Sequence, residues 1–349
     1  MKNLLLAAAG TLCMVSCNNE VDSVLSLDEN SLQTKALVED LDYQVVNYAG
    51  TQCFQFKNDS IFSDLVLKVA GMSDEKKSYF FSNFDFVSQQ DLMEEADREQ
   101  EAIVDSYENS LEPVWPYQQI KSFKQKYEDV FMFNPYDSTD FIANYKVKNT
   151  IYRCFVNRQG IFLIGDSVVQ CPTYGIEEFF GSSIVTCGDN EATNESSSTN
   201  NAESKYQIPG GDYAKVRAIW NFAEQTISNK NFQYIDIDYL SQKKKVLWKK
   251  HHATVHLRFK ATASGEGIEV YNEAYSRFEN QNNANVMLYT EVYDKKNVNL
   301  GRFGETAKPS GPVVGPFTRY SLDGRMEIWS NEIPETNKGT SKLYFLKNW

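Results

Sequence analysis

Two aspartates that stand two residues apart are the first candidates for acid–base or metal chemistry in this 349-residue chain. Asp236 and Asp238 lie in Phe232–Leu240, where polar residues alternate with apolar ones. On a strand, residues two apart point to the same side with their carboxylates about 7 Å apart. Such a pair could bind calcium or act as acid and base in sugar hydrolysis. A surface salt ladder is the favoured alternative, because exposed charged strand faces are common.

The three histidines of the chain stand at positions 251, 252 and 256. On a helix, His252 and His256 would share a face and could ligate zinc. The segment Val255–Phe259 alternates like a strand, however, and there four residues span about 13 Å, which exceeds the reach of one ion. We therefore expect no metal site. The basic face of His256, Arg258 and Lys260 is expected to pair with the aspartates on a neighbouring strand.

Other chemistry-bearing residues give weaker signals. Glu269 and Glu273 are further candidate acids for a hydrolase. Trp248 stands in a basic island between Lys243 and Lys250, and its ring is a candidate platform for sugar stacking, since sugars bind flat aromatic faces. The chain contains no GxSxG, HExxH or GxxxxGK[ST] motif, so no catalytic residue and no cofactor are predicted.

The N-terminus predicts export. Met1 and Lys2 form a short basic head, and a leucine- and alanine-rich run follows that is too short to span a bilayer. A small residue precedes Cys17 at the end of this run, as in the lipobox of bacterial lipoproteins. We expect residues 1–16 to be a signal peptide and Cys17 to carry lipid. The location expected is the cell envelope, at the outer membrane.

Four further cysteines allow two disulfides in an exported chain. Cys53, Cys154, Cys171 and Cys187 remain once the leader and the lipidated residue are set aside. Four cysteines permit three connectivities, and the sequence does not choose between them. Buried thiols are an equal alternative.

The overall charge restricts the partners. The formal net charge is −12, which disfavours nucleic acid and anionic membrane surfaces as partners. Any hold on a membrane must therefore come from the lipid, and stable anchoring takes more than one acyl chain. The chain is rich in tyrosine (20) and phenylalanine (22), which favours strands.

The hydrophobic pattern predicts an α+β fold: a helical plus small-sheet N-terminal domain (36–187) followed by an antiparallel β-sandwich (209–349). Residues 17–35 are expected to form a lipidated tether, and residues 188–208 a flexible linker, because 188–204 contain no aromatic or large aliphatic side chain. The expected elements are a strand pair in 43–56, helices starting near 59, 73, 88 and 116, a hairpin of strands 150–157 and 161–170, and mostly strands after 209. Residues 214–227 fit a helix or a strand, and we favour a strand.

One stretch resembles a known family. Residues between Lys126 and Val169 read KYEDVFMFNPYDSTDFIANY and then FVNRQGIFLIGDSVV. An NxxGxxxIGDSV-like hairpin after a VFMFNP-type turn resembles a family of uncharacterised Bacteroidales envelope lipoproteins. The resemblance implies a lipobox, a small helical part, this hairpin and a β-rich C-terminal part. It implies no activity and no catalytic residues.

These observations favour a lipid-anchored envelope protein that is not an enzyme and that binds a polysaccharide or another surface protein. A hydrolase that acts on glycans is the first alternative. A structural or adhesive subunit that assembles edge to edge with its own copies is the second.

Overall fold

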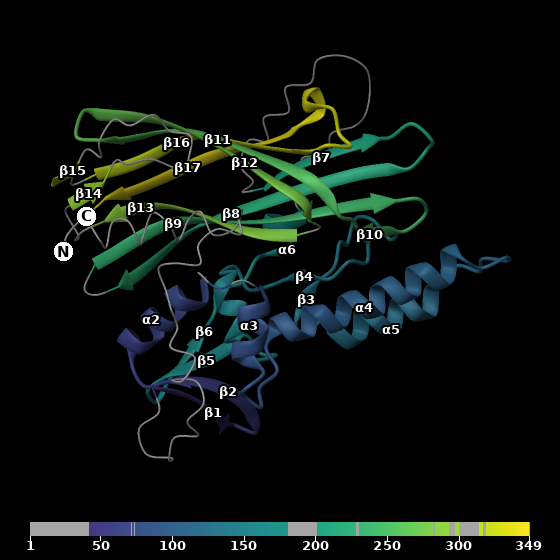
Figure 1. Cartoon of the computed structure of the whole chain (residues 1–349), viewed down its shortest axis with the longest axis horizontal. Helices are drawn as coiled ribbons and strands as arrows, with labels where there is room; N and C mark the ends of the chain where they lie inside the picture. The colour runs from purple at the N-terminus through teal and green to yellow at the C-terminus, as the bar shows by residue number, and fades with distance from the viewer. Residues whose placement is uncertain are drawn as a thin grey trace. The chain divides into compact units, whose positions relative to one another are not determined.

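The computed structural model describes residues 42–70, 72, 74–180, 201–227, 230–281, 283–292, 297–299, 314–316 and 319–348 (Figure 1). The chain is a mixture of helices and, mostly, strands, with several antiparallel sheets. It divides into two compact units, unit 1 (Met1–Asp91 and Ile151–Cys171) and unit 2 (Leu92–Thr150 and Pro172–Trp349). Within the described ranges, the helices are all too short or too polar to cross a bilayer.

Unit 1 is built on a four-stranded sheet of order β1-β2-β5-β6. β1 (Tyr43–Tyr48) and β2 (Thr51–Phe56) form the predicted strand pair, with Ala49 and Gly50 at positive φ in the turn. β5 (Ile161–Ile164) pairs in parallel with β2. The helices of the unit, α2 (Asp59–Ala70) and α3 (Asp74–Phe81), begin where the sequence predicts.

Aromatic rings form the core of unit 1. Phe56 lies edge-on to Phe62, Phe155 and Phe162, with ring centroids 4.9–5.6 Å apart. All four rings are buried. Edge-to-face contacts of this kind add to the stabilisation that burial of the rings provides.

The predicted hairpin of strands 150–157 and 161–170 is wrong in its first half. Residues Ile151–Cys154 form a short 3-10 helix, η2, and the hairpin lies within the second predicted strand, between β5 and β6 (Ser167–Gln170). Its turn contains Gly165 at φ +54°. The apolar run at 151–156 resembled a strand, but the side chain of Asn157 accepts hydrogen bonds from the N–H groups of Gln159 and Ile161 and closes a loop instead.

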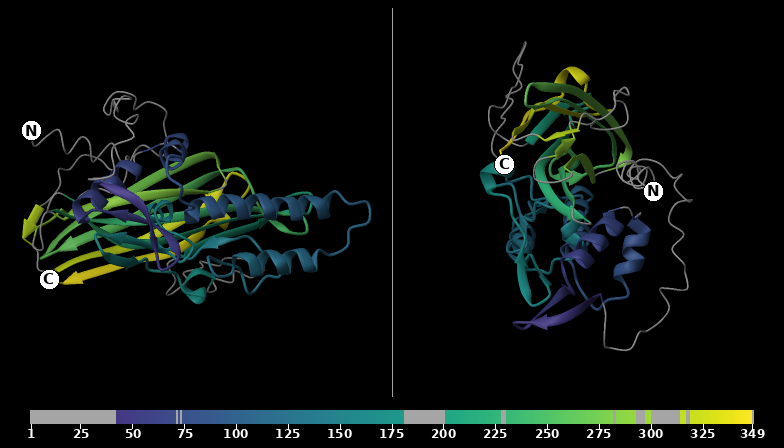
Figure 2. Two further views of the ribbon diagram at one scale, coloured as in Figure 1. Left: turned by 90° about the horizontal axis from the view of Figure 1, so that it is seen from below. Right: turned by 90° about the vertical axis from the view of Figure 1, so that its left-hand side faces the viewer.

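Two helices of unit 2 form an antiparallel pair. α4 (Gln89–Glu108) and α5 (Tyr117–Tyr127) lie side by side in both views (Figures 1 and 2). Their apolar stripes meet in one buried cluster that includes Val104, Ile120 and Phe123. The same cluster contains residues of the short strands β3 (Phe131–Met132) and β4 (Asn144–Tyr145), so the helices and the segment after them pack as one layer.

The remaining strands of unit 2 form two antiparallel sheets, one of seven strands and one of four. Along the seven-stranded sheet the order is β15 (Val314–Pro316), β14 (Asn297–Asn299), β13 (Asn283–Val292), β9 (Lys230–Lys244), β8 (Tyr213–Ile227), β7 (Asn201–Gln207), with β10 (Trp248–Lys250) added to β9. Along the four-stranded sheet it is β12 (Ile268–Gln281), β11 (Ala253–Gly265), β16 (Arg319–Ser330), β17 (Gly339–Asn348).

A single hydrophobic cluster contains side chains from both sheets. On β8 the inward residues include Val216 and Trp220, and on β11 every second residue from Ala253 to Gly265 is buried. This alternation places the charged residues between them on the opposite face of each sheet. The favoured strand over 214–227 is confirmed by β8.

The unit boundaries differ from the predicted domains 36–187 and 209–349. Residues 92–150 belong to the strand-rich unit, because α4 and α5 complete its core. The predicted linker 188–208 is shorter at its C-terminal end, since Asn201–Gln207 is a paired strand. Ala202 lies in the common core of the two sheets, and Tyr206 and Ile208 pack against that core. The polar residues around them made the segment resemble a linker. Residues 188–200 lie outside the described ranges, as do the predicted signal peptide and tether.

We expect Gly324→Ala to destabilise the protein by about 1–3 kcal/mol, the usual cost of overpacking a core. A Cβ at this position of β16 would collide with the backbone of Lys260 and Ala261 on the neighbouring strand. Gly175→Ala is the matched control, because its Cβ would lie 3.9 Å from the nearest atom. Urea unfolding of the full chain measures both. Equal stabilities for the two variants would contradict the close approach of β16 and β11.

Candidate functional site

The two aspartates of the sequence analysis lie on β9 in different surroundings. Asp236 is buried, and Thr150 donates hydrogen bonds to both of its carboxylate oxygens, from the N–H at 2.9 Å and from the hydroxyl at 2.8 Å. A general acid or base must reach its substrate. This carboxylate instead holds the loop at 150 against the sheet.

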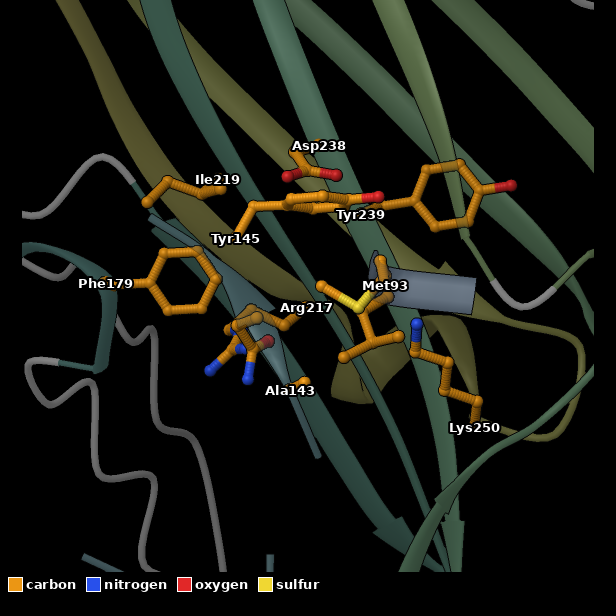
Figure 3. A pocket seen from close by; sticks show the side chains of 11 residues that line it. Met93, Ala143, Tyr145, Phe179, Arg217, Ile219, Asp238, Tyr239 and Lys250 are labelled. Atoms are coloured by element: carbon orange, nitrogen blue, oxygen red, sulfur yellow. The ribbon is translucent and has the colours of Figure 1, made fainter. Parts of the chain in front are cut away.

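Asp238 lines a small cavity in unit 2, together with Tyr145, Phe179, Arg217 and Lys250 (Figure 3). The cavity measures about 30 Å³. A space of this size holds on the order of one or two waters and no sugar ring. The geometry therefore gives no support to sugar hydrolysis by the Asp236/Asp238 pair.

The expected salt ladder between these aspartates and the basic face of β11 does not form, because β9 and β11 belong to different sheets. Arg258 pairs with Glu327 at 3.4 Å and with Glu335 at 2.9 Å. The strand pattern was right, but one sequence contains no information on which strands become neighbours.

Four buried polar residues occupy the face of β8 that is opposite the common core. Lys215 and Asp140 form an ion pair, Nζ to Oδ2, of 2.7 Å, and Arg217 donates to Oδ1 of Asn144 at 2.8 Å. All four side chains are buried. We call Asp140, Asn144, Lys215 and Arg217 the buried polar layer. It joins the segment before β4 to the seven-stranded sheet.

The charges of the buried polar layer compensate one another. Burial opposes ionisation of Asp140, but the nearby Lys215 and Arg217 outweigh it and lower the pKa of Asp140 below its usual value. Burial lowers the pKa of Arg217, against the influence of Glu203, Asp140 and Asp238. The guanidinium carbon of Arg217 lies 4.4 Å from the ring centroid of Phe179 and 4.9 Å from that of Phe180, both cation–π contacts.

Trp248, the candidate stacking ring, is fully buried. The ammonium groups of Lys205, Lys215 and Lys244 lie 5.4, 4.3 and 5.6 Å from its ring centroid, and its indole N–H donates to Asp137 at 2.9 Å. A sugar would have to displace these contacts to reach the ring.

The basic island around this tryptophan is paired with acids from the same unit. Lys249 lies 3.4 Å from Glu108, and Lys250 lies 2.6 Å from Asp97. These pairs attach β10 to helix α4. The island therefore contributes to the packing of the helical layer.

The histidines do not converge. His251 lies 3.1 Å from Glu332, whereas His256 lies on the outer face of the four-stranded sheet and shares a hydrogen bond of 2.6 Å with the Tyr275 hydroxyl. Within the described residues, no group of three or more His, Cys, Asp or Glu side chains could hold a metal ion.

Aromatic rings gather around His256 instead. Its ring stacks on Trp329 at 5.1 Å with an interplanar angle of 13°, and Tyr275 lies 6.0 Å away on a neighbouring strand. The guanidinium of Arg258 lies 5.1 Å from the Trp329 ring. We call His256, Tyr275 and Trp329 the ring cluster. Tyr271 and Tyr344 stand exposed on the same sheet.

The electrostatics keep the ring cluster neutral. Burial lowers the pKa of His256, and the positive charges of Arg277 and Arg258 lower it further, against Glu335. The imidazole is therefore uncharged at pH 7. A neutral stacked ring offers a flat apolar surface, as the neighbouring tyrosine does.

The acids of this face are held by cations. Glu273, a candidate acid of the hydrolase alternative, lies 3.4 Å from Lys260, and Glu269 is exposed at the end of β12. The buried carboxylate of Glu327 has Arg258, Arg325 and Lys338 within 3.4 Å. These pairs fix the positions of the long basic side chains beside the ring cluster.

Three of the four cysteines considered for disulfides are buried thiols of unit 1: Cys53, Cys154 and Cys171. Burial raises the pKa of Cys171 to about 12, which keeps its thiol protonated. Cys17 and Cys187 lie outside the described residues, so lipidation and pairing with Cys187 stay predictions.

Sequence reasoning missed the ring cluster, although it recognised the outward face of β11. The residues that complete it, Tyr275 and Trp329, lie 19 and 73 positions further along the chain. The alternation of Tyr271, Glu273 and Tyr275 on β12 was a usable signal, because it marks one more outward face that bears aromatic residues.

Comparison with known proteins gives the family. The model of the family described as "Domain of unknown function (DUF4848)" matches residues 45–267. This chain belongs to the DUF4848 family. A search of the curated proteins found no match. A crystal structure of a DUF4848 family protein from Bacteroides thetaiotaomicron VPI-5482 is similar, with 23% identity, 86% of this chain and 100% of that chain covered, and a TM-score of 0.36.

The family match confirms the expectation of a family of unknown function. The matched range includes β8, β9 and β11 of this DUF4848 chain but ends before β16, so Trp329 of the ring cluster lies beyond it.

We expect Lys215→Met to lower the free energy of unfolding by about 3–5 kcal/mol, because it leaves Asp140 as a buried charge without its ammonium partner. Lys126→Met is the control, since it breaks the exposed pairs with Glu95 and Glu99 and should cost less than about 1 kcal/mol. Urea unfolding at pH 7 measures both. Similar losses of unfolding free energy in the two variants would contradict the conclusion that the buried polar layer stabilises the fold.

The ion pair between Lys215 and Asp140 predicts that the free energy of unfolding decreases at acidic pH. The folded-state pKa of Asp140 lies below its usual 3.8, so its contribution is complete above that pH and is lost as the pH falls towards the folded pKa. Between about pH 5 and pH 2, the Asp140→Asn variant should therefore lose less stability than the unmodified chain. Thermal melting across this pH range measures it, and parallel profiles would contradict the assignment.

Proposed function

We propose that this protein is a lipid-anchored envelope protein that binds glycan on the outer face of its four-stranded sheet. The ring cluster is the observation that carries the proposal. Its exposed ring is that of Tyr275 (38%), whose hydroxyl shares a hydrogen bond with His256. The His256 ring stacks on Trp329, which is buried beneath it, and the Arg258 guanidinium lies beside that ring. Stacking on the apolar faces of sugar rings and hydrogen bonding to their hydroxyls need these two kinds of group.

The exposed side chains extend this surface. Tyr271 on the edge strand β12 is 61% exposed, and Tyr344 on the opposite edge strand β17 is 50% exposed. Lys342 lies 5.6 Å from the Tyr344 ring centroid, so an ammonium donor accompanies that ring too. Tyr271 and Tyr344 lie in one row across the sheet, level with Thr262, six residues along β11 from His256. A glycan that runs along the strands could contact this row and the ring cluster with different sugars.

The two sheets support this surface as a β-sandwich. The shared hydrophobic cluster supports this arrangement, because inward residues of both sheets contribute to it. A sandwich of this kind gives the outer strands a rigid base. Binding residues on rigid strands lose little conformational freedom when they contact a ligand.

The proposed location rests on the N-terminal sequence. The leader at residues 1–16 and the Cys17 that follows it are typical of an exported lipoprotein, and residues 17–35 would tether the folded units to the outer membrane. An acidic chain avoids anionic surfaces, so lipid would provide the attachment.

A surface protein is the second candidate ligand. Exposed tyrosines with nearby arginines also characterise the energetically dominant residues of protein interfaces. Tyr271, Tyr344 and Leu346 are the exposed large side chains that favour it.

Titration with soluble polysaccharides tests the proposed function. A bound glycan at about a hundred times its dissociation constant adds about 2.7 kcal/mol of stability, which raises the melting temperature by several degrees. Tyr275→Ala should weaken binding about fivefold, because loss of one stacking ring costs about 1 kcal/mol.

Tyr79→Ala is the control for that variant, because Tyr79 is exposed on helix α3 of the other unit. It should bind as the unmodified chain does. Flat melting curves with plant and host polysaccharides would contradict the glycan proposal. Binding that Tyr275→Ala leaves unchanged would place the glycan elsewhere.

A further inference from the structure

The loop between α4 and α5 carries the two most exposed large hydrophobic side chains in the described part of the chain. Leu111 is 101% exposed and Val114 83%, the two highest values among the exposed large hydrophobic residues of those ranges. Tyr117 is 60% and Trp115 40% exposed. We call Leu111, Val114, Trp115 and Tyr117 the hairpin tip. Exposed apolar side chains gathered within one short segment, residues 111–117, are typical of an interaction site.

The hairpin tip is held outward by its own contacts. The Trp115 ring lies edge-on to Tyr107 of α4, with centroids 5.8 Å apart. The N–H of Tyr117 donates to the carbonyl of Trp115 at 2.8 Å, and Pro113 and Pro116 fix two φ angles of the loop. The exposed side chains thus lie on an ordered loop.

The position of the loop suits contact with an extended surface. Both figures show it at the free end of the α4–α5 pair, projecting beyond the strand ends on that side of the unit (Figures 1 and 2). The rest of the pair is fixed by a buried cluster that includes Phe123 and Leu247. A tip on two packed helices can contact a surface without rearrangement of the sheets.

We propose that the hairpin tip inserts into the interfacial region of a lipid bilayer whose headgroups carry no net charge. Leucine and valine at the end of the loop suit the acyl boundary, and tryptophan and tyrosine behind them are the residues enriched at headgroup level. The inference rests on the proposed lipid anchor, which would keep the tip beside a membrane. One attachment of modest affinity becomes stable and oriented when a second accompanies it.

The charges near the loop select the kind of lipid. Between positions 105 and 121 the charged residues are three acids, Asp105, Glu108 and Glu112, and one base, Lys121. Lys249 lies 3.4 Å from Glu108 and 3.8 Å from Asp105, so it compensates part of this charge. An anionic surface would repel what remains, whereas a zwitterionic one would not.

The size of the hairpin tip argues against a protein as the occupant. It consists of four side chains at the end of two helices, whereas a stable protein interface uses about 20–30 residues on each side. A bilayer requires no complementary shape. The same four side chains can enter it at any point of its surface.

Vesicle binding tests the proposal. The probe is the chain from Asn18 onward, which lacks the site of lipid attachment and retains every residue that the structure describes. We expect it to bind vesicles of phosphatidylcholine, with quenching of tryptophan emission by brominated acyl chains. Binding to phosphatidylglycerol vesicles at low salt should be weaker. The double variant Leu111→Ser/Val114→Ser should lose at least about tenfold in partition coefficient.

Val87→Ser/Val168→Ser is the matched control, because both valines are exposed and lie outside the hairpin tip. It should bind as the unmodified chain does. No binding by the unmodified chain, or equal binding by the tip variant, would overturn the proposal. Self-association that the tip variant abolishes, without lipid binding, would overturn it in favour of a second copy. Because this probe carries no lipid and no glycan, its result is independent of whether Cys17 is acylated and of whether the ring cluster binds glycan.

Discussion

The ion pair between Lys215 and Asp140 is the interaction on which unit 2 depends. Its two charges lie on the face of β8 that is opposite the common core, so the sheet is buried on both faces at this point. Removal of two charges from water is costly, and the attraction between them offsets that cost only when the geometry is close. The 2.7 Å separation and the hydrogen bonds around it meet this condition. The segment before β4 and the two long helices are attached to the sheet through this layer.

Within unit 2, the residues that hold the layers together and the residues of the proposed binding surface lie on different sheets. Polar residues that resembled a catalytic or binding set, among them Asp236 and Trp248, hold the covering layer to the seven-stranded sheet. The four-stranded sheet has the opposite distribution, with an apolar inner face and rings and charges on its outer face. The proposed glycan surface and the proposed membrane contact lie on different elements of the same unit, the outer strands and the helical hairpin.

Local patterns predicted the elements well. The helix starts near 59 and 73, the alternation of β8 and β11 and the turn at Ala49 and Gly50 all appear where the sequence indicates. One predicted hairpin was wrong. The strand expected at 150–157 contains a 3-10 helix, and the hairpin of the structure turns at Gly165. The relation of α4 and α5 to the sheets was not predictable, because an amphipathic stripe does not specify its partner. For the same reason Asp236 was expected beside β11, on a sheet to which it does not belong.

The central claim is that the polar face of β8 and β9 is covered, whereas the outer face of the four-stranded sheet exposes the tyrosine rings of β12 and β17. Hydroxyl-radical footprinting of the chain in solution, read by mass spectrometry, tests it most directly. The account predicts rapid oxidation of Tyr271 and Tyr344 and protection of Trp248, which is fully buried despite its polar neighbours. Oxidation of Trp248 as fast as that of the two tyrosines would contradict the account.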